Sequence, residues 1–224
     1  MNLGSPFLYP IIDIEVCRVR GFDPVAVARA FLAGGARVLQ LRQKAGPSAS
    51  FLDLADSLVS VARPFDAMVI INDRADIARF SGAHGVHVGQ DDLSPSDVRK
   101  VAGAAAVVGL STHDEPQIDA ALGSEATYIA VGPIFGTTTK DTGYSARGLD
   151  LLGHAAKRGK PVVAIGGITL ERVPEVMRAG ATGIAVITDL LTGNDLEART
   201  REFITRLTES SGTLQNPVEP GRTS

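Results

Sequence analysis

The sequence predicts a single (β/α)8 barrel, the TIM-barrel class of α/β fold. Eight short apolar runs rich in Val and Ile recur along the chain, Ala-rich segments with helical spacing separate them, and polar clusters follow several of the runs. Strands that are buried on both faces of a parallel sheet read as continuous apolar stretches, and their alternation with helices is typical of parallel α/β folds. A doubly wound open sheet is the competing arrangement.

The expected strands are 7–13, 37–42, 67–73, 85–88, 107–112, 128–135, 162–166 and 183–188. Helix starts are expected at Ser94, where Pro95 follows a capping residue, at Asp114, and at Thr169. The small-residue turns 33–36 and 179–182 are expected to end helices ahead of the next strand.

Length and composition predict one domain followed by a tail. A chain of 224 residues that is 44% hydrophobic can bury one full core and is short for two. We therefore expect a single catalytic barrel domain over 1–209. Residues 210–224 contain Ser, Gly, Thr, Asn and two prolines with few apolar side chains, so we expect this tail to be disordered.

Charge and cysteine content exclude several classes of protein. A net charge of -3 provides no basic field for nucleic acid, so any recognition of phosphate has to be local. The single cysteine, Cys17, excludes an internal disulfide and fits a reducing compartment. With no apolar stretch of about 18 residues and no signal-peptide pattern, we expect a cytoplasmic protein that does not bind membranes. The sequence does not decide between a monomer and a homo-oligomer.

Polar clusters stand where barrel chemistry is expected, at the carboxyl ends of the strands. In the first cluster, strand periodicity places Gln40, Arg42 and Lys44 on one side and Leu41 on the other. Two cations that face a barrel interior need anionic partners, which favours an anion clamp. The alternative is a strand end whose charges spread into solvent.

Carboxylates follow the next two strands. Asp73 comes after Asn72, and Asp92 comes after Gln90 and Asp91. Mg²⁺ takes oxygen ligands, often one or two carboxylates together with substrate phosphate and water, so Asp73 and Asp92 form a candidate magnesium site. The alternative is that each acid caps a helix.

The later loops suggest phosphate binding. Thr137, Thr138, Thr139 and Lys140 offer hydroxyls and an ammonium group, although they lack P-loop spacing and a solvated turn is the alternative. The turn 166–169 and the pair Ile187 and Thr188 follow the seventh and eighth strands, where this fold recurrently binds phosphate.

The aromatic and histidine residues give weaker signals. His84 and His87 lack further ligands at zinc spacing, so we expect no zinc site. His113 stands at a strand end, where a substrate contact and a structural role are equally compatible. Tyr128 and Phe135 are expected to be packing residues.

In this order, the clusters resemble those of thiamine phosphate synthases. The resemblance runs from about Leu8 to Thr188 and rests on Gln40-Leu41-Arg42-x-Lys44, Ile71-Asn72-Asp73, Gly85-x-His87-x-Gly89-Gln90-x-Asp92, Gly109-Leu110-Ser111, Gly132-Pro133-Ile134-Phe135 with 137–140, and Gly166-Gly167-Ile168-Thr169. Ile12 departs from a position where many relatives carry a hydroxyl residue, and Thr188 replaces a common serine.

The resemblance implies a transferase that joins 4-amino-5-hydroxymethyl-2-methylpyrimidine diphosphate to 4-methyl-5-(2-phosphoethyl)thiazole and releases diphosphate. It implies that Asp73 and Asp92 bind Mg²⁺. The residues implied to hold the pyrimidine diphosphate are Gln40, Leu41, Arg42, Gln43, Lys44, Asn72, Ser111 and Lys140. Those implied to hold the thiazole phosphate are Thr137, Thr138, Thr139, Gly167, Ile187 and Thr188. Arg42, Lys44, Ser111 and Lys140 are the implied catalytic residues.

Two other functions remain as alternatives. One is a thiazole tautomerase, which would need no Mg²⁺; in those relatives a histidine stands at the position of Pro133, which disfavours this assignment. The other is a catalytically silent barrel that binds thiamine precursors.

Overall fold

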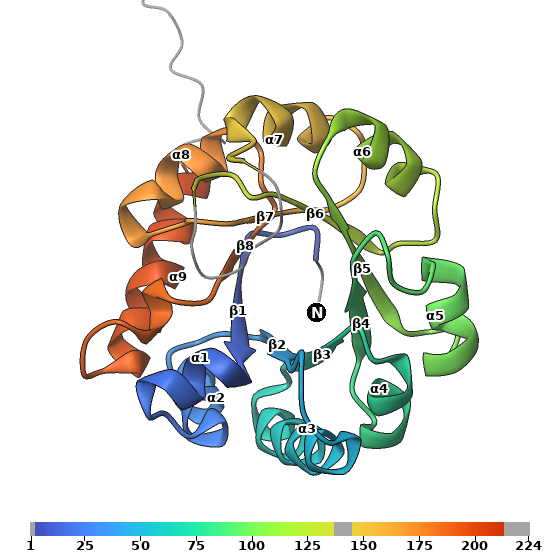
Figure 1. The fold of residues 1–224 in the computed structure, drawn as a ribbon. Helices are drawn as coiled ribbons and strands as arrows, with labels where there is room; N and C mark the ends of the chain where they lie inside the picture. Colours follow the sequence, from blue (N-terminus) through green and yellow to red (C-terminus); the bar gives the residue numbers. More distant parts are fainter. Residues whose placement is uncertain (1–2, 137–144, 213–224) are drawn as a thin grey trace, which may run out of the picture.

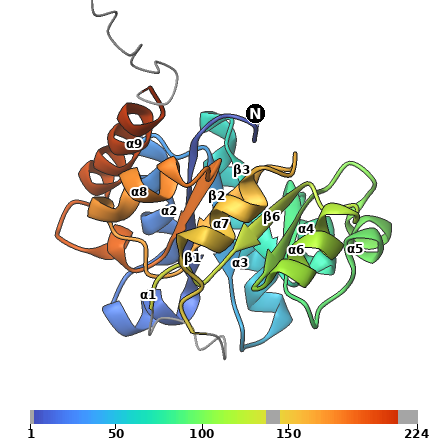
Figure 2. The ribbon, with the colours of Figure 1, turned by 90° about the horizontal axis from the view of Figure 1, so that it is seen from above.

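A closed parallel barrel forms the centre of the molecule. The computed structural model describes residues 3–136 and 145–212, and within them eight strands close in sequence order from β1 to β8, with β8 pairing back to β1. Helices surround the strands in both ribbon views (Figure 1, Figure 2). The predicted (β/α)8 barrel is confirmed, and the open sheet is excluded.

Three of the eight strands have the expected bounds, and the other five are shorter by one or more residues. The strands span β1 Phe7–Asp13, β2 Val38–Arg42, β3 Met68–Asn72, β4 Gly85–Val88, β5 Val107–Thr112, β6 Tyr128–Val131, β7 Val162–Ile165 and β8 Gly183–Val186. The largest difference is in β6, which ends four residues before the expected boundary at Phe135. Pro133 has no N–H for a strand ladder, which is a physical reason for the strand to end there.

The helices begin largely where the sequence indicates. They span α1 Ile14–Arg20, α2 Pro24–Ala33, α3 Ser48–Ala62, α4 Ala75–Ser81, α5 Pro95–Ala102, α6 Glu115–Leu122, α7 Gly148–Ala156, α8 Val173–Arg178 and α9 Leu196–Gly212, with 3-10 turns η1 Arg63–Phe65, η2 Leu170–Arg172 and η3 Asp189–Leu191. Ser94 caps α5 by accepting from the Asp97 N–H, and Asp114 caps α6 by accepting from the Gln117 N–H. Thr169 precedes the short η2 turn without a side-chain capping bond.

Two apolar cores hold the barrel together. An outer core lies between strands and helices and includes Leu41, Phe31 and Phe203. An inner core fills the barrel and includes Phe7, Tyr9 and Tyr128. Such layers of side chains make this fold a packed structure rather than a pore.

The two ends of the described chain lie at different places on the barrel. Leu3 packs with the inner core just before β1 begins, so it covers the amino-terminal end of the strands. The last helix, α9, continues to Gly212 and so includes Ser210 and Ser211 of the expected tail. Residues 213–224 of that tail lie outside the described part. Among the described residues, no helix is both long and apolar enough to cross a membrane.

Candidate active site

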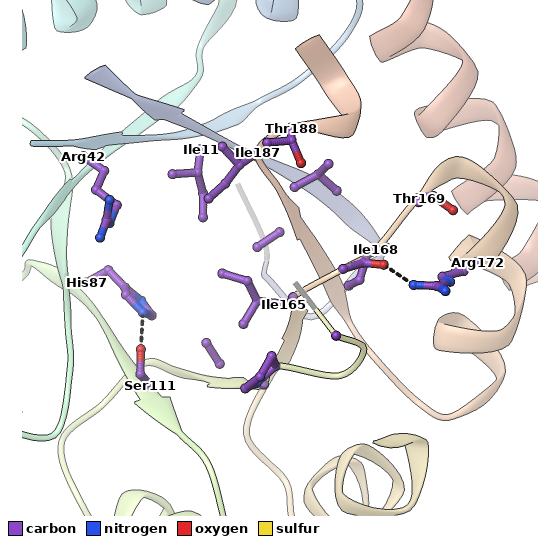
Figure 3. A pocket seen from close by; sticks show the side chains of 18 of the residues that line it. Ile11, Arg42, His87, Ser111, Ile165, Ile168, Thr169, Arg172, Ile187 and Thr188 are labelled. Carbon is purple, nitrogen blue, oxygen red and sulfur yellow. Dashed lines mark hydrogen bonds between the residues drawn. The ribbon is translucent and has the colours of Figure 1, made fainter. Parts of the chain in front are cut away.

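A cavity of about 560 Å³ opens at the carboxyl ends of the strands. One side carries Arg42, His87 and Ser111, and the opposite side carries Arg172 and Thr188 (Figure 3). Between them lie apolar side chains that the same view shows, namely Ile11, Ile165 and Ile187. The volume falls in the range of about 300–1,000 Å³ that is typical of small-molecule sites.

Arg42 faces the cavity and is held by a buried carboxylate. It ends β2 beside Asp13, the last residue of β1, and its Nη1 donates to Asp13 Oδ2. Asp13 also caps α1, because its Oδ1 accepts from the N–H groups of Glu15 and Val16. The Arg42 side chain is 14% exposed, so the alternative of charges spread into solvent is wrong for this residue. Arg42 Nε is buried and has no hydrogen-bond partner within the described residues.

Asn72 presents a second buried donor at the neighbouring strand end. It closes β3 with 5% of its surface exposed, and its Nδ2 likewise has no partner within residues 3–136 and 145–212. A buried polar atom without a partner costs about 1–3 kcal/mol, so such atoms often face a ligand. Two of them on adjacent strands identify this side of the mouth as a place where a polar ligand fits.

Asp73 and Asp92 are not helix caps. The capping position of α4 is Arg74 and that of α5 is Ser94, so the competing explanation for both acids is wrong. Asp73 has a φ of 62°, a left-handed conformation that is uncommon outside glycine, and its carboxylate accepts from the Lys44 ammonium. Asp92 Oδ2 accepts from the Gly89 N–H at 2.8 Å.

The donor chemistry of the two acids fits Mg²⁺. The described residues contain no cluster of three or more His, Cys, Asp or Glu side chains that could hold a metal by themselves. Mg²⁺ does not need such a cage, because it commonly uses one or two carboxylates and completes its shell with water and substrate phosphate. Neither Asp73 nor Asp92 caps a helix, and Asp73 has a strained backbone conformation, so both carboxylates suit that sparse coordination.

The glycine turn on the opposite side depends on its lack of side chains. Gly166 and Gly167 have φ of 100° and 63°, and a Cβ on Gly167 would lie 2.6 Å from the Gly136 carbonyl oxygen. Arg172 Nη1 donates to the Gly167 carbonyl at 2.6 Å, and its guanidinium stacks over the Phe135 ring at 4.2 Å. Figure 3 shows Arg172 at the edge of the cavity beside this turn. Arg172 therefore fixes the peptide that the sequence predicts as a phosphate site.

Below the mouth, polar groups cross the barrel interior. Tyr9, Tyr128 and His87 form hydrogen bonds that lead from Gln40 on β2 to Ser111 on β5. Burial raises the pKa of the Tyr9 and Tyr128 phenols, so both keep their protons at neutral pH. Tyr128 is a packing residue as predicted, but its hydroxyl also takes part in this hydrogen bonding, which no local sequence pattern indicates.

The remaining predicted residues have different outcomes. The Leu41 side chain packs in the outer core, so any substrate contact of Leu41 would use its backbone. Gln43 is partly buried just after β2. Ile187 and Thr188 line the cavity. His113 also lines it, and its Nδ1 bonds the Gly132 carbonyl oxygen. Thr137, Thr138, Thr139 and Lys140, which were predicted to bind phosphate, lie outside the described residues.

Fold and site together define a (β/α)8-barrel enzyme whose mouth combines polar and cationic groups on one side with a glycine turn on the other. Residues 8–190 match the family model described as thiamine monophosphate synthase. The chain belongs to this family and is an enzyme of the transferase class.

Individual relatives agree over most of the chain. It is 42% identical over 209 residues to the thiamine-phosphate synthase of Koribacter versatilis, covering 91% of this chain and 96% of that protein. It is also 42% identical over 181 residues to that of Anaeromyxobacter dehalogenans, covering 80% and 81%. Among solved structures, the thiamine phosphate pyrophosphorylase from Pyrococcus furiosus superposes with a TM-score of 0.83 at 28% identity, covering 93% of this chain and 98% of that one.

Proposed function

We propose that this enzyme joins 4-amino-5-hydroxymethyl-2-methylpyrimidine diphosphate to 4-methyl-5-(2-phosphoethyl)thiazole and forms thiamine phosphate and diphosphate. The observation that carries this proposal is the two-ended cavity. One end presents Arg42, whose buried Nε lacks a partner in the described structure, and the other presents the glycine turn. Asn72, whose buried Nδ2 likewise lacks a partner among the described residues, ends the strand next to that of Arg42. Two substrates that each carry a heterocycle and a phosphate group match two polar ends with an apolar centre.

The pyrimidine diphosphate is assigned to the end with the cations. Arg42, Lys44, Asn72 and Ser111 come from β2, β3 and β5 or the loops after them, and Gln40 lies just below. A planar guanidinium can bind two phosphate oxygens in a bidentate manner, while the amide of Asn72 and the hydroxyl of Ser111 can each donate a hydrogen bond. Lys140 stays a prediction for the same end.

The thiazole phosphate is assigned to the glycine turn. Gly167 and the pair Ile187 and Thr188 line the cavity there, after β7 and β8. Backbone N–H groups at glycine turns can surround a phosphate group closely, because no Cβ blocks the approach. Thr137, Thr138 and Thr139 stay predictions for this substrate.

The reaction balances without a protein nucleophile. The bond between the pyrimidine methylene carbon and the diphosphate oxygen breaks, and its electron pair leaves with diphosphate. The lone pair of the thiazole nitrogen then forms the new carbon–nitrogen bond. The cations Arg42 and Lys44 stabilise the negative charge that develops on the leaving group, and holding both substrates in one cavity aligns the nitrogen with the carbon.

Mg²⁺ belongs to the same proposal. Asp73 and Asp92 would hold it beside the diphosphate end, where a bound divalent cation neutralises negative charge on phosphoryl oxygens. Lys44, which contacts the Asp73 carboxylate, adds a further positive charge to that end.

A cytoplasmic location also stays a prediction, which fractionation of the native cells would test.

The test is a mass-spectrometric assay with both substrates and Mg²⁺, run with and without EDTA. The Asp92→Ala variant is compared with Asp91→Ala, a matched change at the neighbouring exposed carboxylate. We expect thiamine phosphate from the wild type and from Asp91→Ala, and its loss with EDTA and in Asp92→Ala. Folded wild-type protein that forms no product would overturn the proposed function. Binding of both substrates without turnover would favour the catalytically silent barrel instead.

A further inference from the structure

A continuous line of hydrogen bonds crosses the inside of the barrel and ends at the cavity. Gln40 Nε2 donates to the Tyr9 hydroxyl at 3.0 Å, and the Tyr9 and Tyr128 hydroxyls lie 2.9 Å apart. The Tyr128 hydroxyl lies 3.0 Å from His87 Nδ1, and His87 Nε2 lies 2.9 Å from Ser111 Oγ. We call these five residues the interior chain. It links two predicted substrate residues, Gln40 and Ser111, through three side chains that were not predicted to bind substrate.

The chemistry of the groups sets the direction of the interior chain. The Gln40 amide nitrogen can only donate, so the Tyr9 oxygen accepts from it. Tyr9 then donates its single hydroxyl hydrogen to Tyr128, and Tyr128 donates its own to His87 Nδ1. An Nδ1 that accepts leaves the hydrogen of the neutral imidazole on Nε2, which donates to Ser111 Oγ. The hydroxyl hydrogens of Tyr9 and Tyr128 and the imidazole hydrogen of His87 then each have an acceptor.

The reverse direction leaves a buried hydrogen unused. If His87 Nδ1 carried the hydrogen, Tyr128 would donate to Tyr9, whose oxygen would then accept from both Gln40 and Tyr128. The Tyr9 hydroxyl hydrogen would have no acceptor among the described residues, although Tyr9 is 1% exposed. Buried polar groups are rarely left unsatisfied because water cannot replace the missing partner. The forward direction is therefore favoured.

A glycine makes room for the interior chain. Gly109 lies between His87 and Tyr128 in the strand register, paired with both. A Cβ there would lie 2.3 Å from the Tyr128 hydroxyl oxygen and 2.4 Å from His87 Nδ1. The space left by Gly109 allows the two rings to stack at 5.6 Å between centroids and to form their hydrogen bond.

We propose that the interior chain makes Ser111 a hydrogen-bond donor to the substrate. Because Ser111 Oγ accepts from His87, its own hydroxyl hydrogen is free to point into the cavity that Ser111 lines. Figure 3 shows Ser111 and His87 together on that side. This inference rests on the proposed function, in which Ser111 contacts the anionic pyrimidine diphosphate. Tyr128 and Tyr9 are then positioning residues that act through His87.

Nitrogen NMR on the substrate-free protein tests the direction. The chain has four histidines, so ¹⁵N-histidine signals can be assigned by single substitutions. We expect His87 with a protonated Nε2 and an Nδ1 that accepts a hydrogen bond. Tyr128→Phe should shift the Nδ1 signal because it removes the donor. Tyr9→Phe removes a matched hydroxyl but keeps the Tyr128 donor, so it should leave that signal in place. A His87 protonated on Nδ1 would overturn the proposal.

Kinetics test whether the interior chain acts through Ser111. A hydrogen bond to a charged ligand accounts for a roughly ten- to hundredfold effect, so Ser111→Ala should raise the KM for the pyrimidine diphosphate by about that factor. Tyr128→Phe alone should raise it severalfold, yet add nothing in a Ser111→Ala background. Additive effects would mean that Tyr128 supports only the fold and would overturn the proposal. A protein with the expected tautomer but no turnover would support the direction of the interior chain and overturn the proposed function.

Discussion

Neutralising Asp13 should destabilise the barrel strongly, although this residue is not among the predicted substrate ligands. Its side chain is 5% exposed and performs two tasks, pairing with Arg42 through Oδ2 and capping α1 through Oδ1. Asp13→Asn keeps an oxygen that can cap the helix but removes the charge. Asp13→Ala removes both functions, so the pair of variants separates the ion pair from the cap.

The structure sets the expected size of each effect. Removing one partner of a buried ion pair costs about 3–5 kcal/mol, and the lower end applies because the Arg42 side chain retains 14% exposure. Losing the cap adds about 1 kcal/mol. We therefore expect losses of about 3 kcal/mol for Asp13→Asn and about 4 kcal/mol for Asp13→Ala. For a protein of this size, each kcal/mol of lost stability lowers Tm by about 2–4 °C. Tm should therefore fall by about 6–12 °C in Asp13→Asn and by about 8–16 °C in Asp13→Ala.

Thermal unfolding followed by circular dichroism measures both losses. The control is Glu197→Gln, which breaks the exposed pair with Arg201 on α9, where the two side chains are 46% and 59% exposed. Exposed pairs contribute about 0–1 kcal/mol, so that variant should change Tm by at most a few degrees. If Asp13→Asn changed Tm no more than Glu197→Gln does, the buried pair would not stabilise the barrel and our reasoning would fail.

Three further predictions follow from burial and contacts. Burial raises the pKa of the Cys17 thiol to about 11, so iodoacetamide should label it in urea but not in the native protein, as mass spectrometry would show. Burial lowers the pKa of His84, whose Nδ1 accepts from the Val69 N–H, so the unfolded chain binds more protons than the folded one. Stability should therefore fall as the pH drops below about 6.5. Measurements of Tm across pH should show a smaller fall in His84→Asn than in the wild type. Arg172→Ala should raise the KM for the thiazole phosphate roughly tenfold, because the Gly167 peptide loses its donor, while the exposed control Arg178→Ala should not change it in initial-rate assays.

The fold was predictable because its signals are local. Strands buried on both faces need apolar side chains at nearly every position, and β1, β4 and β5 were expected with their observed bounds. Capping is also local, since Ser94 and Asp114 bond N–H groups three residues ahead. Where the next residues decide a strand end, as after β6, an apolar run overestimates its length.

The rim of the site was partly predictable because the fold gathers strand ends at one edge. Strand periodicity indicated Arg42 as part of an anion clamp, whereas the resemblance to thiamine phosphate synthases implied Asn72 and Ser111. The structure brings Arg42 and Ser111 to one cavity. Arg172 escaped notice because its role depends on a carbonyl and a ring that no local pattern pairs with it. It comes three residues after the helix start expected at Thr169, and it received no predicted role.

The interior chain could not have been found from any one segment. Tyr9, His87 and Tyr128 are far apart in sequence, and each sits in an apolar strand where a buried aromatic or imidazole ring needs no special explanation. Their hydrogen bonds exist because barrel closure turns Tyr9 of β1 and Tyr128 of β6 toward each other inside the barrel, and because Gly109 leaves a gap of one side chain between His87 and Tyr128. A glycine in a buried strand weakens it, so its presence in β5 signals close approach of neighbouring groups. Read together with the barrel register, that glycine is the sequence feature that could have indicated polar chemistry inside an apolar core.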